Sequence, residues 1–167
     1  MSRLHGRRSN ARRPRPASRA LALLALLALP AAAPAAAEAQ YAVAQVQPLA
    51  FGYLTQGVTE IVAPTDAFRR GVLTLDGPGQ AWIRLVLPTA LTSALGATIP
   101  LQFLTGDVTA QETGKPPAAF DPTTSTRVNL SKGTASLFIG GRAVAAVDQR
   151  AGDYTATMTI IVSSTKF

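Results

Sequence analysis

Residues 154–163 read Tyr-Thr-Ala-Thr-Met-Thr-Ile-Ile-Val-Ser, and this stretch indicates the fold class more clearly than any other. Its even-numbered residues are all apolar, whereas its odd-numbered residues are threonine or serine with the exception of Ile161. Alternation with a period of two is typical of a strand that is buried on one face only. We therefore predict one antiparallel strand over residues 154–163, with the even-numbered side chains facing the core.

The residues before this strand predict a β-hairpin. Two alternating runs, 134–139 and 142–147, flank the pair Gly140-Gly141, and adjacent glycines can adopt the positive φ angles that a tight two-residue turn requires. A hairpin in this register would place its buried residues on one face of the ribbon. The expected core face is Ala135, Leu137, Ile139, Val144 and Ala146.

A second pair of runs, 71–75 and 80–87, brackets the sequence Asp-Gly-Pro-Gly at positions 76–79, whose composition predicts a turn. In the second run Ile83, Leu85 and Leu87 share one face. Trp82, the only tryptophan, lies on the opposite face, and we interpret it as core or sheet-edge packing rather than as a ligand platform.

Short apolar or alternating runs recur about every ten residues from Tyr41 onward, separated by turn-forming residues, and no long helical periodicity is present. This pattern is typical of an all-β sandwich or barrel, and residues 40–167 fit one domain. Residues 109–122 are rich in proline and are expected to form a long surface loop. Weaker strand candidates are 42–46, 50–54, 58–62, 99–105 and 126–130.

Residues 1–39 have the organisation of a cleavable signal peptide. Seven arginines and no acid occupy the first 19 residues, and only alanine and leucine follow from position 20 to 29, before Pro30. The small-x-small pattern Ala37-Glu38-Ala39 predicts cleavage after Ala39, with Ala37 as the alternative. An uncleaved anchor would need about 20 apolar residues, roughly twice this run. The pair Arg7-Arg8 leaves the twin-arginine export route open beside the general one.

The leader also accounts for most of the positive charge. The whole chain carries 16 basic and 9 acidic residues, a net charge of +7. Seven of those basic residues and one of the acids lie within positions 1–39, which leaves a net charge of +1 for the remainder. That remainder has no basic patch with interleaved aromatic residues, so we expect no binding of DNA or RNA.

The composition of the mature chain excludes several kinds of catalytic and metal-binding site. The chain has no cysteine, and its only histidine, His5, lies in the leader. Catalytic triads, Cys-His dyads and the usual zinc or copper sites all need these residues. We expect no catalytic, cofactor-binding or metal-binding residues, although carboxylate chemistry stays formally open. The carboxylates concerned are Glu60, Asp66, Asp76, Asp107, Glu112, Asp121, Asp148 and Asp153.

Four motifs carry a resemblance to a known family. They are Leu-Ala-Phe-Gly at 49–52, Ala-Ser-Leu-Phe-Ile-Gly-Gly at 135–141, Asp-Gln-Arg-Ala-Gly-Asp-Tyr-Thr-Ala-Thr at 148–157 and Ile-Ile-Val at 160–162. Together they resemble secreted bacterial domains of unknown function related to spore coat protein U and to fimbrial subunits of the Mat/Ecp type. The resemblance spans residues 49–162, with its specific motifs at the two ends.

The resemblance implies an immunoglobulin-like antiparallel β-sandwich of Greek-key topology behind the signal peptide helix. It also implies a fimbrial-like subunit of the periplasm or cell surface that has no catalysis and no membrane span after cleavage. Such subunits would associate through sheet edges by strand addition, with an export chaperone and usher as possible partners. Residues 41–48, from Tyr41 to Pro48, are either the donor segment or the first strand of the chain's own sandwich.

Two other functions remain open from the sequence. One is a monomeric periplasmic binding module for a sugar, lipid or peptide, which would need a concave apolar pocket. The other is a carboxylate-based hydrolase, which would need two carboxylates facing each other across a cleft. The sequence indicates no specific residue for either role.

Overall fold

The computed structural model describes residues 40–167, which form thirteen β-strands and no helix. The all-β prediction is therefore confirmed, while the expected signal peptide lies outside the described residues. No helix long and apolar enough to cross a membrane occurs within residues 40–167. The strands are β1 (Ala42–Gln47), β2 (Thr59–Val62), β3 (Gly71–Asp76), β4 (Gln80–Val86), β5 (Ala90–Ser93), β6 (Thr98–Gln102), β7 (Val108–Glu112), β8 (Ala118–Phe120), β9 (Thr126–Asn129), β10 (Ala135–Ile139), β11 (Gly141–Val144), β12 (Tyr154–Thr155) and β13 (Thr159–Ser163).

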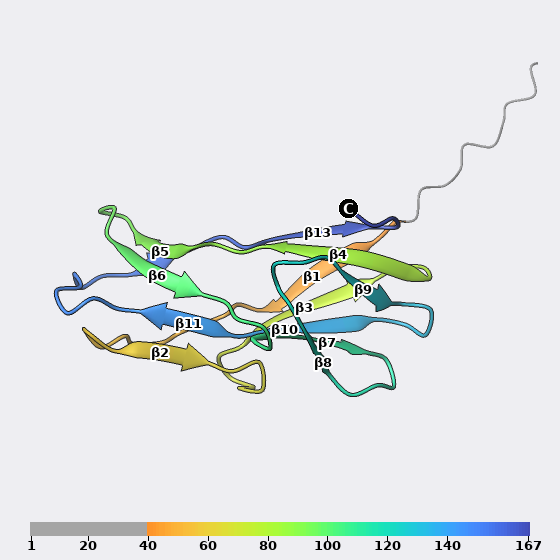
Figure 1. Cartoon of the computed structure of the whole chain (residues 1–167), viewed down its shortest axis with the longest axis horizontal. Coiled ribbons are helices and arrows are strands. Elements are labelled where there is room, and N and C mark those ends of the chain that lie inside the picture. Colours follow the sequence, from red (N-terminus) through yellow and green to blue (C-terminus); the bar gives the residue numbers. More distant parts are fainter. Residues whose placement is uncertain (1–39) are drawn as a thin grey trace, which may run out of the picture. The chain divides into compact units, whose positions relative to one another are not determined.

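All strand pairs are antiparallel and fall into three sheets (Figure 1). The first sheet has the order β1-β3-β10-β7-β8, the second β12-β5-β6-β11-β2, and the third β13-β4-β9. The turn at residues 76–79 lies where the sequence predicts it, between β3 and β4. These two strands belong to different sheets, so this turn carries the chain from one sheet to another rather than closing a hairpin.

The main core lies between the first and the third sheet. Leu75 and Leu137 from the first sheet pack together with Ile83 and Val128 from the third, and each is 0–1% exposed. Burying one such side chain contributes about 1.5–3 kcal/mol relative to leaving it in water. The alternation predicted for the run at residues 80–87 is confirmed, because Ile83 and Leu85 are buried while Arg84 is exposed.

The hairpin predicted at Gly140-Gly141 is wrong. β10 pairs with β3 and β7, whereas β11 pairs with β2 and β6, so one extended segment passes from the first sheet into the second (Figure 1). Neither glycine has a positive φ. The alternation continues through both glycines, so Ala143 and Ala145 are buried in place of the expected Val144 and Ala146. Ala135, Leu137 and Ile139 are buried as predicted.

Close approach of neighbouring backbone explains the two glycines. A Cβ at Gly140 would meet the Val62 carbonyl oxygen and would lie 2.9 Å from the nitrogen of Pro64. A Cβ at Gly141 would lie 2.8 Å from the ring of Phe103. The absence of a side chain therefore lets the extended segment pass close to its neighbours, which is a role of glycine distinct from turn formation.

The strand predicted at residues 154–163 divides into β12 and β13, which pair with β5 and β4 respectively. Residues 156–158 join them without strand pairing. The predicted core face is largely correct, because Tyr154, Met158, Ile160 and Val162 all pack against core clusters. Ala156 is the exception and is exposed.

Three further expectations differ from the structure. The predicted loop at 109–122 is a hairpin of β7 and β8, whose turn takes up the prolines at 116 and 117. Residues 50–54 form no strand, and β5 was not expected from the sequence. Trp82 is half-buried on the outer face of the central strand of the third sheet, where the Lys166 ammonium lies 5.5 Å from its ring.

Candidate functional site

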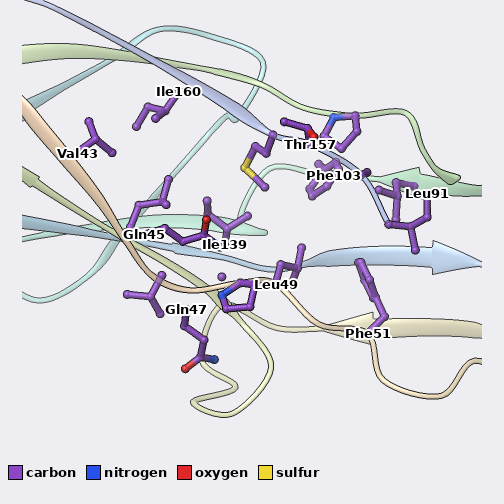
Figure 2. Close-up of a pocket in the computed structure, with 18 residues that line it drawn as sticks. Val43, Gln45, Gln47, Leu49, Phe51, Leu91, Phe103, Ile139, Thr157 and Ile160 are labelled. Atoms are coloured by element: carbon purple, nitrogen blue, oxygen red, sulfur yellow. The ribbon is translucent and has the colours of Figure 1, made fainter. Parts of the chain in front are cut away.

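A groove of about 470 Å³ lies between β1 and the chain segment that leads into β13 (Figure 2). β1 forms one wall and residues 156–160 the other, while Leu73 and Ile139 of the first sheet line it between them. The complete lining is Val43, Gln45, Gln47, Pro48, Leu49, Phe51, Gly71, Val72, Leu73, Pro88, Leu91, Leu101, Phe103, Ile139, Ala156, Thr157, Met158 and Ile160.

β1 places its odd-numbered side chains along the groove. Val43, Gln45 and Gln47 line the wall, as the pleat of a strand requires for alternate residues (Figure 2). The amide of Gln47 is fixed, because its Nε2 donates a 2.8 Å hydrogen bond to the Arg70 carbonyl. Between Gln45 and Gln47 the pairing with β3 shifts by a bulge, and Val46 at the bulge is 64% exposed.

The groove is flanked by strand edges that have no partner within the described chain. β1 is the outer strand of the first sheet, paired only with β3, and β13 is the outer strand of the third sheet, paired only with β4. Five of the six residues of β1 are exposed. Each outer strand therefore presents main-chain N–H and C=O groups that could pair with an added strand.

The chemistry of the groove is apolar and uncharged. None of its lining residues carries an ionisable side chain, and Thr157 supplies its only hydroxyl group. Such a lining offers neither an acid–base pair nor a charged anchor for a polar ligand. It suits an extended peptide segment or an apolar small molecule.

None of the candidate carboxylates lines the groove, and six of the eight, all except Asp148 and Asp153, form hydrogen bonds or ion pairs with nearby groups. Asp66 caps the β2–β3 loop by accepting hydrogen bonds from the N–H groups of Phe68 and Arg69, at 3.1 and 3.2 Å. Asp76 and Asp121 accept comparable bonds from main-chain N–H groups one and two residues further on. This agrees with the usual role of aspartate in turns.

Four ion pairs occur within residues 40–167. The guanidinium of Arg69 contacts Glu60 at 2.5 Å and Asp66 at 2.8 Å, at a site that is partly exposed. Lys115 contacts Glu112 at 2.5 Å. Residues 40–167 contain no group of three or more histidine, cysteine, aspartate or glutamate residues that could hold a metal ion.

The most buried ion pair joins Asp107 to Arg142. The Asp107 side chain is 10% exposed, and its Oδ2 accepts hydrogen bonds from Arg142 at 2.9 Å and from the Leu104 N–H at 2.7 Å. Its main-chain carbonyl accepts a bond from the Gly140 N–H at 2.7 Å. Asp107 therefore fixes the β6–β7 loop to the segment that crosses between sheets, which is a structural role.

Hydrogen bonds shift the pKa of several half-buried carboxylates in the same direction, downward. The Arg69 guanidinium, supported by the Phe68 N–H, holds the pKa of Asp66 below its ordinary value. The hydrogen bond from Lys115 lowers the pKa of Glu112 in the same way. These shifts keep both groups ionised, whereas a general acid needs a raised pKa.

A smaller cavity of about 170 Å³ lies beside the β7–β8 hairpin. Glu112, Lys115, Arg127 and Phe120 contribute to its lining. Since Glu112 is already paired with Lys115, and its Oε1 accepts a hydrogen bond from the Asn129 N–H, this cavity offers no free carboxylate. The groove beside β1 is therefore the better candidate for a binding site.

The sequence predicted some of the residues that line the groove but not that a groove would form. The even-numbered residues of 154–163 were expected to face inward, and Met158 and Ile160 do line it. Nothing in the sequence indicated that this face would remain partly uncovered beside β1. Comparison with known protein families, with curated proteins and with solved structures gives no match for this chain.

Proposed function

We propose that this chain is an exported structural or adhesive surface protein, a pilin-like or coat-like subunit that assembles by β-strand addition and performs no catalysis. The observation that carries the proposal is the exposed outer strand β1, which borders the uncharged groove and pairs only with β3. An extended segment from another copy that takes the place of β1 would gain main-chain hydrogen bonds from β3 and would bury apolar side chains against Leu73 and Ile139.

The proposal includes an immunoglobulin-like β-sandwich of Greek-key topology. Its support is that consecutive strands repeatedly change sheet: β3 leads to β4, and β9 leads to β10, across the core shared by the first and third sheets. Export to the periplasm or cell surface follows from the leader at residues 1–39. A chaperone that covers the groove before assembly, and an usher, are the partners that this function would require.

The proposed donor is residues 41–48 of a neighbouring copy. In the single chain this segment contains β1, which pairs with its own β3. Because β1 has only one neighbour and is exposed at five of six residues, its release costs little buried area. The same contacts with β3 can then form between two copies, as in the exchange of an identical element.

Engineered cysteines test this exchange directly, since the chain has none of its own. Ala44 lies opposite Thr74 in the β1–β3 register. A chain with Ala44→Cys is mixed with a chain carrying Thr74→Cys under mild oxidation. Exchange predicts disulfide-linked pairs containing one chain of each kind, detected by non-reducing electrophoresis and mass spectrometry.

The double variant Ala44→Cys/Thr74→Cys is the matched control, because self-pairing gives an internal disulfide within one chain and no doubling of the mass. Only internal disulfides, with no mixed pairs even at high protein concentration, would contradict the exchange. Deleting residues 41–47 should also abolish higher oligomers in size-exclusion chromatography. A wild-type protein that stays strictly monomeric at high concentration would refute assembly as a whole.

The groove favours one second candidate, a monomeric binding module for an apolar or peptide ligand. Its volume of about 470 Å³ falls within the range of small-molecule sites, which is about 300–1,000 Å³. This function predicts a monomer whose thermal unfolding temperature rises with one class of ligand. Ligand stabilisation together with a concentration-independent monomer would favour it over assembly.

A further inference from the structure

Three loops at one end of the strands each carry a large apolar side chain that faces solvent. They are residues 52–58 before β2, residues 94–97 between β5 and β6, and residues 145–153 between β11 and β12 (Figure 1). The relative exposure is 104% for Tyr53, 84% for Leu95 and 83% for Val147. We call these three side chains and their loops the loop-tip surface; none of the three lines the groove.

Hydrogen bonds hold two of these loops together. The Gln56 side chain donates to the Gln149 carbonyl at 2.7 Å, and the Gly57 N–H donates to the Ala146 carbonyl at 3.0 Å. Gly57 has a positive φ and lies so close to Val147 that an added Cβ would be 3.0 Å from its Cγ1. The loops at residues 52–58 and 145–153 therefore form one connected surface.

The loop at residues 94–97 is a tight turn. The Ser93 N–H donates to the Ala97 carbonyl at 2.9 Å, and the Ala97 N–H donates to the Ser93 hydroxyl at 3.0 Å. β5 also pairs with β12 through Ser93 and Tyr154, and the Tyr154 hydroxyl donates to the Arg150 carbonyl. Polar contacts behind the tips thus keep the apolar side chains from folding back onto the core.

Large exposed apolar side chains are distributed unevenly between the two ends of the strands. Residues 52–58 and 94–97 contain no charged residue, and the third loop contains Asp148, Arg150 and Asp153. The turns at the other end, after β3, β7 and β9, carry charged residues (Figure 1). Within residues 40–167 those turns expose no large apolar side chain. The apolar character is therefore specific to one end.

We propose that the loop-tip surface inserts into the surface of a lipid bilayer. Its three side chains stand on separate turns and so form protrusions rather than a flat face. They are too few to bury the roughly 1,200 Å² that a specific protein–protein interface needs, which argues against a second copy of the chain. A bilayer accepts apolar protrusions without requiring a complementary shape. The loops have no basic excess, so the partner is a zwitterionic rather than an anionic lipid surface.

The test measures co-sedimentation with phosphatidylcholine vesicles, using the protein that accumulates in cells expressing the whole chain, with its N-terminus defined by mass spectrometry. The variant Tyr53→Ser/Leu95→Ser/Val147→Ser should lower the partition coefficient at least tenfold. The matched control is Phe68→Ser, which removes a side chain that is 92% exposed in the β2–β3 loop and should leave binding unchanged. Thermal unfolding should be the same for all three proteins.

A fluorescent label at position 147 reports whether this loop itself enters the lipid, independently of any other contact between the protein and the vesicle. Because the chain lacks cysteine, Val147→Cys can be labelled at a single site with an environment-sensitive dye. Vesicles should shift its emission to the blue, with little change when anionic lipid is added or salt is raised, and a label at Phe68→Cys should not respond. No shift at position 147, equal binding by the triple variant, or dimers that the triple variant abolishes would each overturn the proposal.

Discussion

The hydroxyl group of Tyr41 donates a 2.7 Å hydrogen bond to the main-chain carbonyl of Gln80. Tyr41 directly precedes β1 of the first sheet, whereas Gln80 begins β4 of the third, so this bond joins two sheets. The Tyr41 ring also packs against the main core and close to Gly77. Together these contacts anchor the start of the otherwise exposed β1.

Loosening this anchor should release β1 without unfolding the protein. Tyr41→Phe removes the hydrogen bond and keeps the ring, and we expect a loss of about 0.5–1.5 kcal/mol. Hydrogen exchange should show faster exchange of the β1 amides than of those in β4. Tyr53→Phe is the control, because Tyr53 is fully exposed. Equal exchange rates in the two variants would show that the hydroxyl of Tyr41 anchors nothing.

The close approach of neighbouring backbone at Gly140 predicts a larger loss of stability than the Tyr41 substitution does. In Gly140→Ala the added methyl group would meet the backbone of residues 62–64, and the resulting strain should destabilise the protein by about 1–3 kcal/mol. Chemical denaturation measures this loss. Gly79→Asn is the control, because Gly79 has a φ of 67° and nothing within 4 Å, and asparagine tolerates that conformation. A cost at position 140 no larger than at position 79 would contradict the crowding.

The Asp107–Arg142 pair should behave as a coupled structural contact. Asp107→Ala leaves the Leu104 N–H and the Arg142 guanidinium without their acceptor, and we expect a loss of about 2 kcal/mol. A double-mutant cycle with Arg142→Met should give a coupling energy of about 1 kcal/mol. Strictly additive effects of the two substitutions would mean that the pair contributes nothing beyond its separate residues.

Stability should fall in acid through the exposed ion pairs. The folded-state pKa values of Asp66 and Glu112 lie below their ordinary values, because Arg69 and Lys115 favour the ionised forms. Their stabilisation is therefore complete above the unfolded pKa, near pH 4, and is lost as the pH falls through the lower folded values. The unfolding temperature should drop as the pH falls below about 4.5, and Asp66→Asn should make this dependence shallower. An unchanged pH profile in this variant would exclude Asp66 as a contributor.

Local alternation allowed much of the secondary structure to be predicted from the sequence. The turn at residues 76–79 and the buried positions of β4 follow directly from local composition and a period of two. The hairpin at Gly140-Gly141 could not be decided locally, because a glycine pair fits a turn and a crowded extended segment equally well. Only the contact with residues 62–64, distant in sequence, distinguishes the two.

The groove was harder to predict for a related reason. Its walls come from β1 and from residues 156–160. β1 is held in place by pairing with β3, and β13, which begins within the second wall, is held in place by pairing with β4. Alternation marks Ile160 as inward-facing but does not show whether another strand covers it. Exposure of β1 depends on where the sheets end, which is a property of strand order and not of any single segment.

The position of β4 between β9 and β13 governs when the third sheet can be completed during synthesis. Ile83 is opposite Val162 in that sheet, so one edge of β4 stays unpaired until β13 has left the ribosome. Pairings between such distant segments slow folding, because a long loop must close before any contact forms. The core shared by the first and third sheets is thus expected to be completed only after β13 is free, long after β3 and β4 have been made.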